Sequence, residues 1–200
     1  DLSTLESDLV NIFKIGWGYS EAVVKSQQGG QGILRITLKF PLLRDLGLSS
    51  YASEALHLKV EISHHPQASE IQHTPIFYHG RSFVPAHFSL ETMMAGKMIA
   101  CLERSFQQGR QGAMIKGRDF YDLLWFMQQG IQPLAEKLAE DGAKAHTPGS
   151  AMQALSEKVA KIRTTDLAQD LLPMFESRPF IETWLEYFHE NFARYAKQYL

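Results

Sequence analysis

Residues 118–122 hold the densest group of charged side chains in the sequence, with Arg118, Asp119 and Asp122 close together. On a helix, Arg118 and Asp122 are four positions apart and Asp119 and Asp122 three, so the side chains would be neighbours. Both aspartates share a stripe with Leu123 and Phe126, which should be buried. Buried carboxylates are costly unless paired or used. Two interpretations stay open: a functional pair, or a first-turn aspartate favoured by the helix dipole beside one ion pair.

Lys97 is a second candidate because it interrupts an apolar row. Leu90, Met94, Lys97 and Cys101 recur at helical spacing, and Arg104 lies two turns beyond Lys97 on the same side. A lysine in such a row either extends its ammonium to the surface or directs it into a polar cleft. In a cleft, phosphate would be a natural counter-charge.

Glu61 is the third candidate, in the middle of an alternating segment that is typical of a strand. A rigid strand fixes the direction of a carboxylate, which suits a metal ligand or a general base. The alternative is a solvent-facing residue with Lys59 as its neighbour on the same face.

The histidines and the single cysteine predict no metal centre. Six of the 8 histidines fall between positions 57 and 87, but no pair has the spacing of a structural zinc site. Cys101 is expected to be a small core residue. One cysteine cannot form an internal disulfide, which favours a reducing compartment.

Composition points to a globular protein. The 200 residues carry 20 basic and 22 acidic side chains, so the net charge is −2. Electrostatic binding of nucleic acid over the whole surface is therefore not expected. The longest apolar runs fall short of a membrane span, and the first residues do not look like a signal peptide. We therefore expect a cytoplasmic protein that does not bind membranes.

The first part of the chain favours a helix followed by strands. Ser3 and Glu6 have capping-box spacing, and an apolar face runs from residue 5 to 13. Residues 27–32 look like a flexible turn. Strict alternation predicts strands at 34–40 and 56–62, and shorter ones near 70–73 and 81–84. This thin sheet resembles the end of a larger one.

From Ser89 onward the period becomes helical. The expected helices span 89–107, 118–129, 133–141, 151–163, 165–174 and 180–199. The last has an apolar stripe of Ile181, Trp184, Leu185, Phe188 and Phe192. The fold class is therefore α+β, with a partial mixed or antiparallel sheet and a leading helix in 1–88 and a helical bundle in 89–200.

Three segments together resemble one protein family. They are residues 58–62 (LKVEI), 95–104 (AGKMIACLER) and 118–123 (RDFYDL). Their order and spacing, over about residues 34–130, resemble the nucleotidyltransferase-like AbiEii/AbiGii toxins. The resemblance implies a polymerase-β-like core followed by a helical bundle. It also implies transfer of a nucleotide from an NTP, with Mg²⁺, to an acceptor such as RNA, and an antitoxin protein as partner.

The resemblance also implies roles for individual residues. Glu61 resembles the last carboxylate of the metal-binding set. Lys97 matches the lysine of the family's A-x-K-x-x-A-L-x-x-R helix, which is expected to meet the NTP phosphates, and Arg104 closes that motif. Arg118, Asp119 and Asp122 match the R-D-x-x-D-L helix beside the nucleotide. Catalysis would thus involve Glu61, Lys97, Asp119 and Asp122.

Two departures from the family pattern stand out. The Gly/Ser-rich turn followed by two metal-binding aspartates has no match in this sequence, and Gly96 stands where an acid often precedes the lysine. Metal-dependent nucleotidyl transfer needs two or three carboxylates. We therefore expect a fragment, a degenerate member, or a chain whose catalytic strands lie elsewhere, and little or no activity from this chain alone.

Three readings of the function remain open, and geometry separates them. A nucleotidyltransferase requires Glu61, Lys97 and Asp119 or Asp122 to converge, with Lys97 open to a cleft. A non-catalytic module that binds a partner through its helical bundle requires an exposed apolar patch on the C-terminal helices. An unrelated α+β domain would close Lys97 against Asp119 or Asp122 and leave no room for a ligand.

Overall fold

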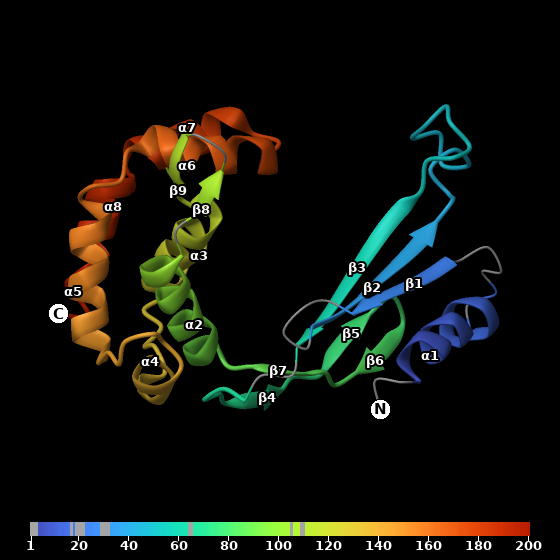
Figure 1. Ribbon diagram of the computed structural model, residues 1–200, viewed down its shortest axis with the longest axis horizontal. Coiled ribbons are helices and arrows are strands. Elements are labelled where there is room, and N and C mark those ends of the chain that lie inside the picture. Colours follow the sequence, from blue (N-terminus) through green and yellow to red (C-terminus); the bar gives the residue numbers. More distant parts are fainter. Residues whose placement is uncertain are drawn as a thin grey trace. The chain divides into compact units, whose positions relative to one another are not determined.

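The computed structural model describes residues 4–16, 18, 23–28, 33–63, 66–104, 106–108 and 111–200. The chain folds as two compact units, which we call the sheet unit (Asp1–Pro66) and the helical unit (Gln67–Leu200) (Figure 1). The described residues form helices and small antiparallel sheets, so the predicted α+β class is confirmed. The predicted division at residues 88 and 89 stays a prediction.

The sheet unit is a three-stranded antiparallel sheet preceded by a helix. Helix α1 (Leu5–Asn11) continues into a π-helical turn, η1 (Ile12–Gly16). The strands β1 (Val23–Gln28), β2 (Ile33–Phe40) and β3 (Leu56–Ser63) lie in sequence order. Ile36 and Leu38 of β2 are buried, as the alternation predicts. The predicted cap Ser3 lies outside the described residues.

The helical unit begins with short strands. β4 (Ile71–His73) pairs with β7 (Ala86–Phe88), and β5 (Ile76–Tyr78) pairs with β6 (Arg81–Phe83). His79 and Gly80 both have positive φ, 47° and 73°, which is the geometry of a tight two-residue hairpin turn. The strands predicted near 70–73 and 81–84 are therefore confirmed, and two further strands pair with them.

The helices of this unit surround one apolar core. They are α2 (Leu90–Glu103), α3 (Gly117–Gln128), α4 (Ala135–Glu140), α5 (Pro148–Val159), α6 (Thr164–Leu171), the 3₁₀ turn η3 (Leu172–Met174), α7 (Arg178–Glu186) and α8 (Phe188–Ala196). Ser89 caps α2 as predicted, because its hydroxyl accepts from the Thr92 N–H at 3.1 Å. The core includes Met98, Leu123, Leu155 and Phe188, from α2, α3, α5 and α8.

Several predicted boundaries were wrong. The helix expected over 89–107 ends at Glu103 and gives way to the hairpin β8 (Phe106–Gln108) and β9 (Gln111–Met114). The last helix divides into α7 and α8, because Tyr187 turns the backbone at ψ 6°. Helix α5 begins earlier than expected, since Thr147 rather than Ser150 is its N-cap. Gln27 and Gln28, expected in a turn, belong to β1.

A buried lysine ties the start of the helical unit to α4. The Lys137 ammonium donates to the Gln67 side-chain oxygen at 2.7 Å and to an Asp141 carboxylate oxygen at 2.5 Å. The other Asp141 oxygen accepts from the Ala68 N–H at 3.1 Å. Gly96 leaves room for this lysine, because a Cβ there would lie 3.3 Å from the Lys137 Cε. The glycine before Lys97 therefore has a packing role in this chain.

Acid is expected to weaken this contact. Burial alone raises the pKa of Asp141, but hydrogen bonds from Lys137 and Ala68 outweigh burial and lower it below 3.8. Because the folded pKa is the lower one, the carboxylate stabilises the fold above pH 3.8, and this contribution disappears as pH falls through the lowered pKa. Urea unfolding between about pH 6 and pH 3 should show Asp141→Asn less stable than the parent protein by about 1–2 kcal/mol at the upper end and by less at the lower end. A constant difference would contradict this.

Candidate functional site

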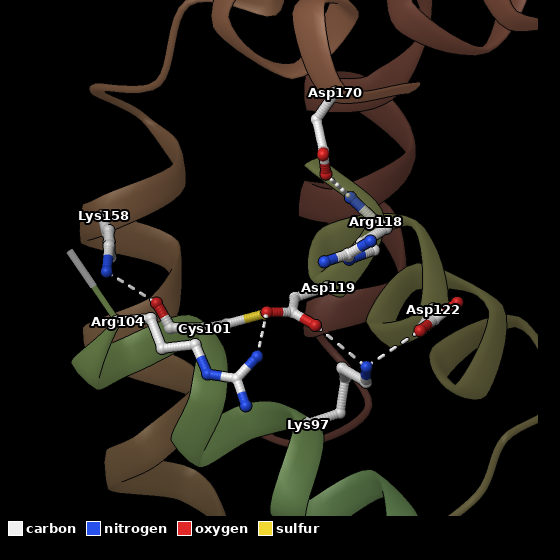
Figure 2. A network of polar contacts seen from close by, with 8 residues as sticks. All are labelled: Lys97, Cys101, Arg104, Arg118, Asp119, Asp122, Lys158 and Asp170. Atoms are coloured by element: carbon white, nitrogen blue, oxygen red, sulfur yellow. Dashed lines mark hydrogen bonds and ion pairs between the residues drawn. The ribbon is translucent and has the colours of Figure 1, made fainter. Parts of the chain in front are cut away.

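Four of the helical candidates meet where α2 faces the start of α3, namely Lys97, Arg104, Asp119 and Asp122 (Figure 2). The Lys97 ammonium lies 2.9 Å from one Asp119 oxygen and 2.8 Å from an Asp122 oxygen. The Arg104 guanidinium donates to the other Asp119 oxygen at 3.0 Å. Two cations and two carboxylates thus form one connected group, which we call the Lys97–Asp119 network.

Burial differs sharply across this network. The Asp119 side chain is 4% exposed, whereas those of Asp122 and Arg104 are 47% and 48% exposed, and that of Lys97 is 25% exposed. Both Asp119 oxygens accept from cations, which offsets the cost of burying the carboxylate. Asp119 is therefore the fixed centre, and the other side chains extend from it towards solvent.

A close approach between helices sets the start of α3. A Cβ on Gly117 would lie 2.7 Å from the carbonyl oxygen of Leu167 in α6, so only glycine fits there. From the same helix, an Asp170 oxygen accepts from the Arg118 N–H at 3.0 Å. This contact satisfies one of the N–H groups that a helix start leaves unpaired. The Arg118 side chain itself is exposed.

Burial and the charges of the network together shift the pKa of Lys97 and of Cys101. Burial lowers the pKa of Lys97, but hydrogen bonds to Asp122 and Asp119 outweigh burial and raise it above 10.5, so Lys97 is a cation at neutral pH. Burial raises the pKa of Cys101 far above its usual value, with a smaller contribution from the Asp119 charge. Cys101 is 2% exposed, which confirms the predicted core residue and leaves it without a reactive thiolate.

Lys116 belongs to the same region and was not predicted from the sequence. Burial lowers its pKa, and the positive charges of Arg118, Arg104 and Lys97 lower it further, against the effect of Asp119. In the sequence, the only indication that Lys116 belongs to this region is its position two residues before Arg118. Cationic charge therefore gathers at this end of α3.

Glu61 lies in the sheet unit, on β3. Arg35 is directly opposite it on β2, and the Arg35 Nε lies 2.8 Å from a Glu61 oxygen. Both side chains are more than half exposed and line a shallow hollow of about 300 Å³ with Ile36, Thr37 and Lys59. Convergence of Glu61 with the Lys97–Asp119 network stays a prediction, as does its role as a metal ligand.

The histidine region gives no sign of a metal centre in the part of the chain that the structure describes. No group of three or more His, Cys, Asp and Glu side chains is arranged to hold a metal ion there. His64 and His65 lie outside the described residues. None of the described helices is long and apolar enough to cross a membrane.

A known protein family matches almost the whole length of this chain. Residues 14–199 match the family described as "Nucleotidyl transferase AbiEii toxin, Type IV TA system". This match defines the class of the protein, which is a nucleotidyl transferase toxin of a type IV toxin–antitoxin system. The chain belongs to the AbiEii family. Comparisons with the curated proteins and with the solved structures found no match.

Family membership excludes one of the three interpretations of the function, and the contacts of Lys97 bear on a second. The chain is not an unrelated α+β domain. Even so, Lys97 is closed against both Asp119 and Asp122, as that reading expected. The nucleotidyltransferase interpretation expected an open Lys97, whereas both carboxylates contact its ammonium.

Proposed function

We propose that this chain handles the nucleotide of a nucleotidyl transfer reaction, and that Lys97, Arg104 and Arg118 bind the phosphates of an NTP. One observation carries the proposal: in a chain of a nucleotidyl transferase family, Lys97 and Arg104 share the buried Asp119 at a half-exposed edge. Charge-assisted hydrogen bonds from arginine and lysine are the usual means of binding phosphate.

The burial of the two carboxylates suggests how a phosphate enters. Asp119 keeps Lys97 and Arg104 aligned, because it is almost fully buried and uses both oxygens. Asp122 is half exposed and contacts Lys97 through one oxygen. A phosphate oxygen takes the place of Asp122 on Lys97, and the displaced carboxylate turns to solvent at little cost.

Arg118 completes the binding of the phosphate chain. It stands at the start of α3, where the helix dipole favours an anion, and its side chain is exposed. Together with Lys97 and Arg104 it supplies three cations, against the one carboxylate, Asp119, that stays in place. The excess positive charge suits a triphosphate.

The described residues do not by themselves fit a Mg²⁺ site. Asp119 and Asp122 are both paired with Lys97, and Glu61 is paired with Arg35. In this reaction class a divalent metal would supply positive charge to the phosphates. We derive no step through it, and we infer that this chain alone binds NTP but transfers nucleotide slowly or not at all.

The family description supports a proposal for the partner. A type IV toxin–antitoxin system implies an antitoxin, and we propose a protein antitoxin and an RNA acceptor hydroxyl. A non-catalytic interaction module is the second candidate. It is favoured by the exposed apolar side chains Met174, Phe180 and Tyr187 on and between the C-terminal helices.

Incubation of the chain with α-labelled NTP, Mg²⁺ and total RNA tests the activity. We expect no label in RNA above that seen with Lys97→Met, while the parent chain still binds NTP. Labelling that Lys97→Met abolishes would show that the chain is active alone. Absence of NTP binding would instead overturn the nucleotide site and favour the interaction module.

A further inference from the structure

Lys158 reaches from α5 to the end of α2. Its ammonium donates to the carbonyl oxygen of Cys101 at 2.6 Å (Figure 2). It also donates to the carbonyl oxygen of Leu102 at 3.0 Å. The last carbonyls of a helix have no partner within the helix, and a cation there also favours the helix dipole. A different helix therefore completes the end of α2.

This end of α2 determines where Arg104 lies. The backbone leaves the helix at Arg104, with φ −69° and ψ 122°, directly after the last turn that Lys158 holds. From this position the guanidinium reaches back to the buried Asp119 at 3.0 Å. A shift of the last turn would move the guanidinium away from the Asp119 oxygen.

Electrostatics supports the same role. The negative end of the α2 dipole and the Asp119 carboxylate lie at the same place, and both need positive charge. Lys158 supplies that charge to the carbonyls, which leaves the Arg104 guanidinium on Asp119. Burial lowers the pKa of Lys158, because its ammonium is partly removed from water. The two carbonyl oxygens are the contacts of this partly desolvated group.

We propose that Lys158 is a positioning residue for the nucleotide site. Lys158 holds the end of α2, so that the Arg104 guanidinium stays in contact with Asp119 and is directed towards the phosphates. The proposal rests on the proposed function for its effect on NTP. Lys158 itself acts through α2 and contacts no part of the nucleotide.

The test compares Lys158→Met, which keeps the aliphatic stem, with Lys158→Arg, which restores the charge and the donors. Titration with Mg²⁺ and NTP should show about tenfold weaker binding for Lys158→Met, the loss of about one charge-assisted contact, and restoration to within about twofold for Lys158→Arg. Lys161→Met, on an exposed lysine of the same segment, should bind as the parent chain. Leu155→Ala, which removes core packing in α5, controls for general destabilisation.

A second measurement needs no nucleotide. Exchange of the Arg104 guanidinium protons, followed by NMR, should be faster in Lys158→Met than in the parent chain and slow again in Lys158→Arg. Unchanged exchange in Lys158→Met, or equal acceleration in Leu155→Ala, would overturn the positioning role. A parent chain that binds no NTP would overturn the proposed function alone, since the Arg104 measurement would still decide the role of Lys158.

Discussion

Asp119→Ala is expected to lower the free energy of unfolding of the helical unit by about 2–3 kcal/mol. Breaking a buried ion pair by removing one partner costs roughly 3–5 kcal/mol, because the other charge is left without compensation. The expected loss is smaller because Lys97 keeps Asp122, and because Arg104 is 48% exposed and regains water. Urea denaturation followed by circular dichroism measures it.

A matched control is available on the surface of the same unit. Arg163 and Asp166 form an ion pair in which the arginine side chain is 78% exposed. Asp166→Ala should therefore cost less than about 1 kcal/mol. Equal losses for the two variants would show that the burial of Asp119 contributes nothing to stability. Asp119→Asn, which keeps the shape and loses the charge, should fall between Asp119→Ala and the parent protein.

Lys97→Met is expected to weaken NTP binding by about 10- to 100-fold, since a hydrogen bond between charged groups contributes roughly 1.5–3 kcal/mol. The methionine keeps the length and apolar character of the stem, which packs in the row of Met94 and Cys101. Calorimetric titration with each NTP in Mg²⁺ measures the change. Lys97→Arg should retain part of the affinity, because it keeps the charge.

The effect of Lys97→Met must be separated from a general loss of positive charge. Arg178 is 73% exposed and pairs with Glu182 in α7, and neither residue belongs to the network. Arg178→Gln removes one positive charge and should leave NTP affinity within about twofold, because exposed charges are screened by salt. An equal loss in both variants would contradict a phosphate site at Lys97.

Helical spacing predicted the burial of Asp119 correctly, but Asp122, expected on the same buried stripe, is half exposed. The spacing could not predict which side chains would pair, because pairing depends on how α2 and α3 pack together. Helical spacing also missed the end of α2 at Glu103. The last carbonyls of α2 accept from Lys158 of α5, which lies more than 50 positions away in the sequence. Local periodicity carries no information on a cap supplied from that distance.

The signal that singled out Lys97 also marks Lys137 and Lys158. Lys158 follows Leu155 by three positions on the apolar side of its helix, and Lys137 follows Leu134, which packs against the core, by three positions. Each proves to bind backbone or side-chain oxygens inside the helical unit. A lysine at the edge of an apolar stripe is therefore a sign of a specific partner, although the sequence does not name it.

The proposed function depends on the binding of nucleotide phosphates by the Lys97–Asp119 network. Calorimetric titration of the 200-residue chain with NTP and Mg²⁺, repeated in the presence of inorganic triphosphate, measures this binding. We predict saturable binding that triphosphate competes away and that Lys97→Met weakens by at least about tenfold. Absence of binding, or binding that neither triphosphate nor Lys97→Met affects, would contradict a phosphate site at the network.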